Sequence, residues 1–99
     1  MIKHISMGRF KEMAAGMSKS ENMEKVRELS FKLNAIPEMR SIEIGFNFLD
    51  APNAFDFVSV SEYEDMEAVK MVVAHALHDE LVDFLKKVTE VTHAVTYEI

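Results

Sequence analysis

The chain has 99 residues, 48% of them apolar and 28% charged, with a formal net charge of −6. This length and composition fit one folded domain and argue against disorder. The acidic balance and dispersed Lys and Arg argue against nucleic acid or an anionic membrane as partner. The absence of cysteine excludes disulfides, thiolate metal sites, Fe–S clusters and Cys nucleophiles.

No segment approaches the 18 or more consecutive apolar residues that span a bilayer. The first residues, Met1 to His4, also lack the apolar core of a signal peptide. We therefore expect a single domain over residues 1–99, with the cytoplasm as its location and no association with membranes.

Residues 2–10 are predicted to form a strand with apolar groups on both faces, so that His4 lies on a strand covered from two sides. Ser18 and Glu21 then form a capping-box pattern. From Glu21 to about Ile36 apolar residues recur every three or four positions, which predicts a helix that ends before Pro37.

Alternating apolar residues predict a strand over 42–48, and strand character resumes over 55–63 after turn-forming residues at 50–53. Asp65 is a candidate cap for a helix that runs to about Val88, with a bend or brief break expected near His75 and His78. Alternation over residues 89–99 predicts a final strand.

The predicted order β-α-β-β-α-β is that of a ferredoxin-like α+β fold, a four-stranded antiparallel sheet with both helices on one face. Because the strands carry apolar residues on both parities, the second face also needs a cover. Pairing of two such faces in a homodimer is the simplest cover.

Two histidines in the second helix, His75 and His78, are three residues apart and so were candidates for joint action on one ligand, metal or proton. Asp79 or His4 would have to complete a metal site, and the segment lacks the longer signatures of known zinc motifs. We therefore predict no metal and no cofactor. For His93, on the last strand, we favour a structural role in a core or an interface.

The sequence resembles the stress-responsive A/B barrel domain proteins, within the dimeric α/β-barrel superfamily. The resemblance extends over nearly the whole chain. It is carried by Ile2-Lys3-His4-Ile5, Ile36-Pro37-Glu38-Met39, the strand from Ile42 to Gly45, His75-Ala76-Leu77-His78 with Phe84, and the ending Val95-Thr96-Tyr97-Glu98-Ile99. Ala76 departs from the family pattern, which usually has proline there.

The resemblance implies that two sheets pair into a dimeric barrel and that each subunit has a pocket between sheet and helices. It implies His4 and His78 as candidate catalytic residues, and His4, Val72, His75, His78 and Phe84 as candidate pocket residues. One family member, a plant polyketide cyclase, uses a tyrosine one helical turn before the final histidine. Val72 matches that tyrosine here and cannot transfer a proton, so that mechanism cannot transfer intact.

Three functions remain as hypotheses. The first is a homodimer that binds a small apolar or aromatic ligand without turnover. The second is a cofactor-independent cyclase, isomerase or monooxygenase in which His78 and His4 act as acid and base. The third is haem or metal binding through a helix histidine.

Overall fold

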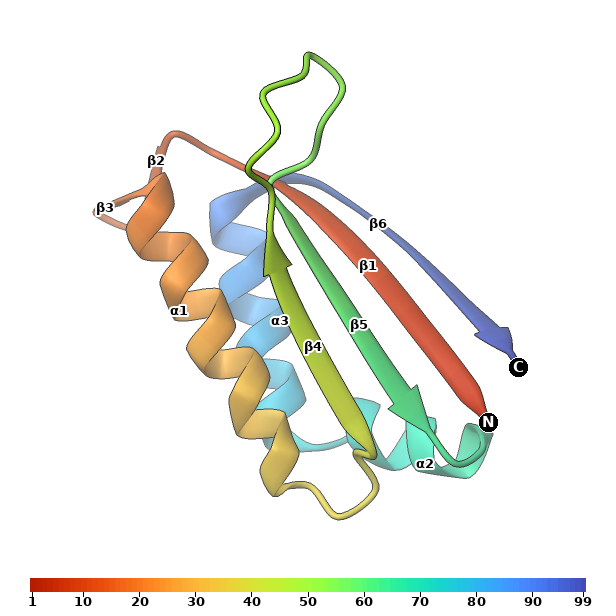
Figure 1. Cartoon of the computed structure of the whole chain (residues 1–99). Helices are drawn as coiled ribbons and strands as arrows, with labels where there is room; N and C mark the ends of the chain where they lie inside the picture. The colour runs from red at the N-terminus through yellow and green to blue at the C-terminus, as the bar shows by residue number, and fades with distance from the viewer.

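One antiparallel sheet carries all the long helices on a single face and leaves its other face open (Figure 1). The structure is a computed structural model that describes residues 1–99. The sheet has four strands in the order β4-β5-β1-β6. Their bounds are β1 Ile2–Phe10, β4 Ser41–Phe46, β5 Phe57–Tyr63 and β6 Thr89–Glu98.

The central strand β1 pairs with β5 on one side and with β6 on the other, both antiparallel. His4 lies opposite Ser61 of β5 and Thr96 of β6 in these registers. Because side chains alternate along a strand, the even-numbered residues of β1 face the helices and the odd-numbered residues face away. The predicted ferredoxin-like order of strands and helices is confirmed.

The first helix, α1 (Lys19–Lys32), begins at the predicted capping box. The Ser18 side chain accepts a hydrogen bond from the Glu21 backbone N–H, and the Glu21 carboxylate accepts one from the Ser18 backbone N–H. After Lys32 the chain tightens into a short 3₁₀ helix, η1 (Leu33–Ala35), and leaves helical geometry before Pro37. The predicted helix is confirmed, with a 3₁₀ turn at its end.

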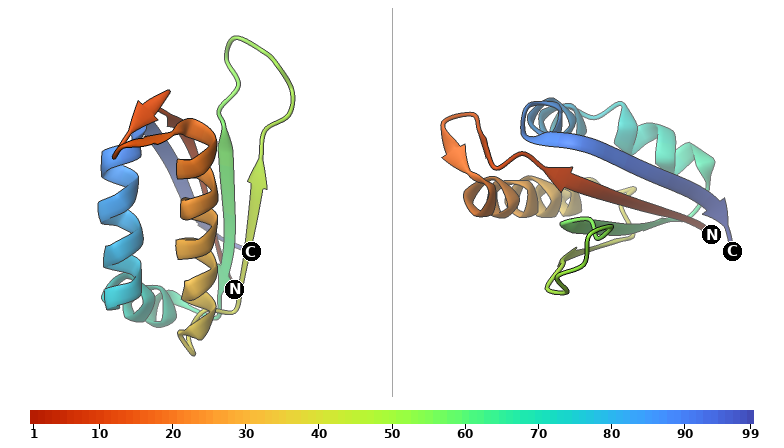
Figure 2. Two further views of the ribbon diagram at one scale, coloured as in Figure 1. Left: turned by 90° about the vertical axis from the view of Figure 1, so that its left-hand side faces the viewer. Right: turned by 90° about the horizontal axis from the view of Figure 1, so that it is seen from above.

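The second helical segment consists of two helices, α2 (Met66–Val73) and α3 (Ala76–Val88). Asp65 caps α2 as predicted, since its side chain accepts from the backbone N–H of Ala68. The expected break falls at residues 74 and 75, where His75 has extended backbone angles and becomes the N-cap of α3. Figure 2 shows α1 and α3 side by side on the same side of the sheet.

A small hairpin before α1 did not follow from the sequence. Strands β2 (Met13–Ala14) and β3 (Met17–Ser18) pair across a turn in which Ala15 and Gly16 both have positive φ, 51° and 74°. The buried Asn22 side chain holds the hairpin by donating to the backbone carbonyls of Ala14 and Met17. The hairpin closes one end of the helical layer (Figure 1).

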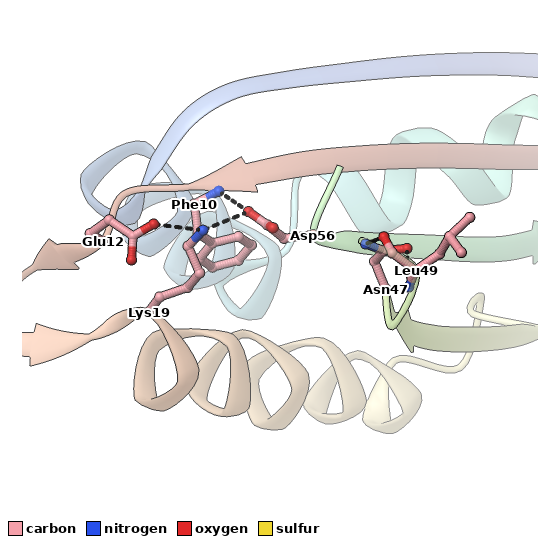
Figure 3. A network of polar contacts seen from close by, with 6 residues as sticks. All are labelled: Phe10, Glu12, Lys19, Asn47, Leu49 and Asp56. Carbon is pink, nitrogen blue, oxygen red and sulfur yellow. Dashed lines mark hydrogen bonds and ion pairs between the residues drawn. The ribbon is translucent and has the colours of Figure 1, made fainter. Parts of the chain in front are cut away.

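The loop between β4 and β5 is longer than expected and projects beyond the sheet (Figure 1). Strand β4 ends at Phe46 rather than residue 48, and β5 begins at Phe57 rather than residue 55. Asp56 anchors the loop by accepting from the Phe10 backbone N–H at 2.7 Å and pairing with Lys19 at 3.5 Å (Figure 3). Asn47 folds back on Leu49, and the Phe48 side chain between them is 98% exposed.

The hydrophobic core fills the space between the sheet and the helices. It contains 14 buried apolar residues, among which Val26 of α1, Val72 of α2 and Val88 of α3 are fully buried. The core thus uses one face of the sheet only.

None of the helices combines the length and the apolarity that crossing a bilayer requires.

The opposite face of the sheet, here called the open face, is largely apolar and has no cover within the chain. Its centre is Ile5 of β1, which lies between Val60 of β5 and Val95 of β6 in the two registers. Met7, Val95 and Tyr97 on this face are exposed to solvent. An exposed apolar sheet face of this kind is unusual for a surface that faces water alone.

Candidate ligand pocket

A cavity of about 430 Å³ lies between the helix-facing side of the sheet and the helices. Strands β1, β4, β5 and β6 form its floor, and α3 forms much of its roof through Leu81, Val82 and Leu85. Cavities of this size hold small organic ligands.

The cavity exists because the floor carries small side chains where a packed core would carry large ones. Ser6 of β1 lies opposite Ser59 of β5, and Ser61 is the next residue of β5 on the same face. These serines leave space under α3 and line it with hydroxyl groups. Ser61 is buried and donates to the Tyr63 hydroxyl, which also lines the cavity.

This hydroxyl floor was missed in the sequence, although a pattern for it was present. Strand β5 alternates Ser59 and Ser61 with Val58 and Val60, so small polar residues share one parity and valines the other. Val58 and Val60 lie on the open face, and Ser59 and Ser61 lie on the cavity side.

His4 enters the cavity from β1 and is held in place by a neighbouring strand. Its Nδ1 lies 2.7 Å from the Thr96 Oγ1 on β6, which leaves the Nε2 free for other contacts. Partial burial lowers the pKa of His4 below its ordinary value, and the nearby His78 lowers it further. His4 is therefore a neutral imidazole at neutral pH.

His78 enters the cavity from the first turn of α3. Burial also lowers the pKa of His78, and the adjacent Asp79 only partly opposes this effect. The structure thus brings together two neutral imidazoles, one from the floor and one from the roof of the cavity. A neutral imidazole has one donor and one acceptor nitrogen, so it can both give and accept a hydrogen bond or a proton.

Three further residues expected at the pocket do not line the cavity. Val72 is fully buried in the core, and Phe84 is buried with Lys25 Nζ 4.9 Å from the centre of its ring. His75 is exposed and caps α3, because its Nδ1 accepts a hydrogen bond from the Leu77 backbone N–H at 3.1 Å. The break before α3 therefore separates His75 from His78.

The metal hypothesis requires His75 and His78 to come together with Asp79 or His4, and the structure does not bring three of these side chains together. No group of three or more His, Asp or Glu side chains comes together in a way that could hold a metal ion. His93 of β6 lies on the open-face parity opposite Met7, with its ring 5.7 Å from that of Phe55, and also borders the cavity.

Comparison with protein families matches residues 2–99 to the stress responsive A/B barrel domain. The chain belongs to this family. Within the A/B barrel family pattern, His4 and His78 are the two candidate residues that the structure places at one cavity. Comparison with curated protein sequences finds no match.

Solved structures similar to this A/B barrel domain include a dimeric ferredoxin-like protein of unknown function from Bacteroides fragilis. It is 25% identical, with a TM-score of 0.84 over 99% of this chain and 95% of that one. A dimeric ferredoxin-like protein from Thermobifida fusca is 21% identical, with a TM-score of 0.85 over 99% and 90% of the two chains.

An enzyme also shares this fold. Hydroxynitrile lyase from Passiflora edulis is 18% identical to this A/B barrel domain, with a TM-score of 0.81 over 99% of this chain and 92% of that one. At this identity the likeness concerns the fold alone.

Proposed function

We propose that the protein is a homodimer in which each subunit binds a small organic ligand in the cavity between sheet and helices. The observation that carries this proposal is the convergence of His4 and His78 on one cavity with an apolar roof and a hydroxyl-bearing floor. Ligand sites commonly combine a mostly apolar lining with a few fixed polar groups.

The open face supports the homodimer. Ile5, Val60 and Val95 form an apolar centre that the chain itself leaves uncovered. Two copies related by a two-fold axis would cover both faces at once, and the similar proteins from Bacteroides fragilis and Thermobifida fusca are dimeric.

The polar groups of the cavity suit a ligand with a carbonyl or hydroxyl group. His4 has its Nδ1 engaged by Thr96, so its Nε2 is available to a ligand. His78 faces the same space from α3, and the Tyr63 hydroxyl lies on the floor. These groups would orient the polar end of a ligand, while Leu81, Val82 and Leu85 contact its apolar body.

A second candidate function is catalysis without a cofactor, favoured by the lowered pKa values of both histidines. A neutral His78 could accept a proton from a carbon or hydroxyl acid, while His4 donates a hydrogen bond to the oxygen on which charge develops. A lyase on the same fold is consistent with such chemistry. Val72 at the family's tyrosine position lies in the core, so any proton transfer would fall to the groups that line the cavity, His4, His78 and the Tyr63 hydroxyl.

The test is native mass spectrometry of the purified protein, with the small molecules released on denaturation identified separately. We expect twice the mass of the 11.3 kDa chain and a bound organic molecule. Ser59→Leu fills the cavity floor, so this variant should keep the dimer and the fold by circular dichroism but lose the molecule. A wild-type protein without bound molecule that also fails to bind apolar probes would overturn the proposal.

Catalysis is tested on the molecule so identified. Turnover that His78→Gln abolishes while binding persists supports the second candidate. A molecule that is bound and recovered chemically unchanged supports binding alone.

A further inference from the structure

The lining of the cavity is free of carboxylates. Asp and Glu make up 17 of the 99 residues, yet none of the 19 residues that line the cavity is acidic. A random sample of this size from the chain would contain about three. The lining therefore lacks the negative charge that predominates in the chain as a whole.

Lys86 is the one Lys or Arg among the lining residues. It lies in the last turn of α3 and takes part in none of the six ion pairs of the chain. Its side chain is exposed, which places it at the mouth of the cavity. A cation without a partner at the mouth of a carboxylate-free cavity attracts negative charge.

Lys86 and His78 lie on the same face of α3. They are eight residues apart, or roughly 12 Å along the helix axis at 1.5 Å per residue. Leu81, Val82 and Leu85 lie between them and line the cavity. One wall of the cavity thus runs from an imidazole, across an apolar stretch, to an ammonium group.

The strand across from Lys86 adds a polar group at the same end. Thr92 of β6 lies opposite Gly8, on the helix-facing side of the sheet, and lines the cavity. Its hydroxyl forms no hydrogen bond within the chain. A hydroxyl donor and an ammonium group in the lining of one cavity are a suitable pair for an anionic oxygen.

We infer that the cavity selects an amphiphilic organic anion. Its acidic group lies at Lys86 and Thr92, its apolar body lies along α3, and its opposite end contacts His4 and His78. This inference rests on the proposed ligand-binding function and adds the charge and the orientation of the ligand. Lys86 is then a specificity-determining residue.

Two fluorescent probes with the same aromatic body test this inference. 1-Anilinonaphthalene-8-sulfonate is anionic, and N-phenyl-1-naphthylamine lacks the sulfonate. Each is titrated into the wild type, Lys86→Gln, the control Lys87→Gln and Ser59→Leu. Lys87 is a matched control because it is the next residue of α3 and does not line the cavity.

We expect Lys86→Gln to weaken binding of the sulfonate about fivefold, as for a solvent-exposed ion pair, and to leave the neutral probe unchanged. Lys87→Gln should change neither affinity, and Ser59→Leu should weaken both. Added salt should weaken the sulfonate alone.

The inference fails, with the proposed function intact, if both probes bind the cavity and Lys86→Gln affects them equally or not at all. It also fails if Lys87→Gln has the same effect as Lys86→Gln, since the attraction would then be general. If neither probe binds the wild type, or if Ser59→Leu leaves both affinities unchanged, the inference and the proposed function fail together.

Discussion

At the residue scale, two histidines three positions apart have different surroundings because His75 lies just before α3 and His78 lies within it. His75 has extended backbone angles and uses its Nδ1 as a helix cap. His78 lies within the first turn and faces the cavity. Spacing predicts a common face only where the backbone is continuously helical. His75 therefore binds a backbone N–H of α3, and His78 faces the cavity.

The lowered pKa values of His4 and His78 predict that stability falls in mild acid. Just below pH 6.5, the ordinary histidine pKa, the unfolded chain binds protons that the folded chain does not. The free energy of unfolding is therefore retained above about pH 6.5, declines as the pH falls below it, and levels off beneath the folded pKa values.

Urea unfolding at fixed protein concentration between about pH 5.5 and 7.5 measures this decline. The double variant His4→Gln/His78→Gln should show a flatter dependence, and each single variant an intermediate one. A double variant with the wild-type slope would mean that other groups cause the decline.

At the element scale, the β2–β3 hairpin contains a residue in an unfavourable conformation. Ala15 has a φ of 51°, in the left-handed region that costs an L-residue about 1–2 kcal/mol. Two-residue hairpin turns with positive φ at both positions favour Asn-Gly, and Gly16 already occupies the second position.

Ala15→Asn should therefore raise the free energy of unfolding by roughly 0.5–1 kcal/mol. Ala15→Val is the matched opposite, because a β-branched residue tolerates positive φ poorly and should destabilise the protein. Denaturant unfolding of the three proteins gives both values. If Asn destabilised the chain as much as Val does, this turn would not have the backbone angles described.

The long elements were predictable because their periodicity and caps agree. Ser18 with Glu21, and Asp65, fixed the starts of α1 and α2, and alternation fixed the parity of β1 and β6. The β2–β3 hairpin was not predictable, since strands of two residues have no alternation to read. The cavity was not predictable in detail either, because it depends on small residues of different strands meeting in one register.

The candidate site could likewise be predicted only in part from the sequence. His4 and His78 both line the cavity, while the pocket and catalytic roles that the family resemblance implies for them stay predictions. Val72 and Phe84 have helical spacing that suits either a pocket or a core, and only the rotation of α2 and α3 against the sheet assigns them to the core. Ser59, Ser61 and Lys86 required three-dimensional placement to be recognised.

At the scale of the whole molecule, the open face is the surface through which we propose that two copies pair. Ile5 lies at its centre between Val60 and Val95, on the parity of β1 that faces away from the helices. Burial of an apolar patch of this kind drives association. A charge at its centre would have to be desolvated without a partner.

We expect Ile5→Glu to be a folded monomer, because the carboxylates of two copies would meet in an apolar interface. Light scattering gives the mass, and circular dichroism shows whether the fold is retained. Met71→Glu is the control, since Met71 is an exposed apolar residue of α2, away from the sheet. A dimeric Ile5→Glu would place the interface on another surface.

The alternation of β1 has a consequence for how this chain can change over evolution. Lys3, Ile5 and Met7 belong to the open face, while His4 and Ser6 belong to the cavity. Under the proposed function, substitutions at the odd positions would affect assembly and substitutions at the even positions would affect ligand binding. The insertion or deletion of one residue within β1 would exchange the two sets and place the His4 imidazole on the open face. A change of length in β1 would therefore disturb both faces at once, whereas a change of one side chain affects a single face.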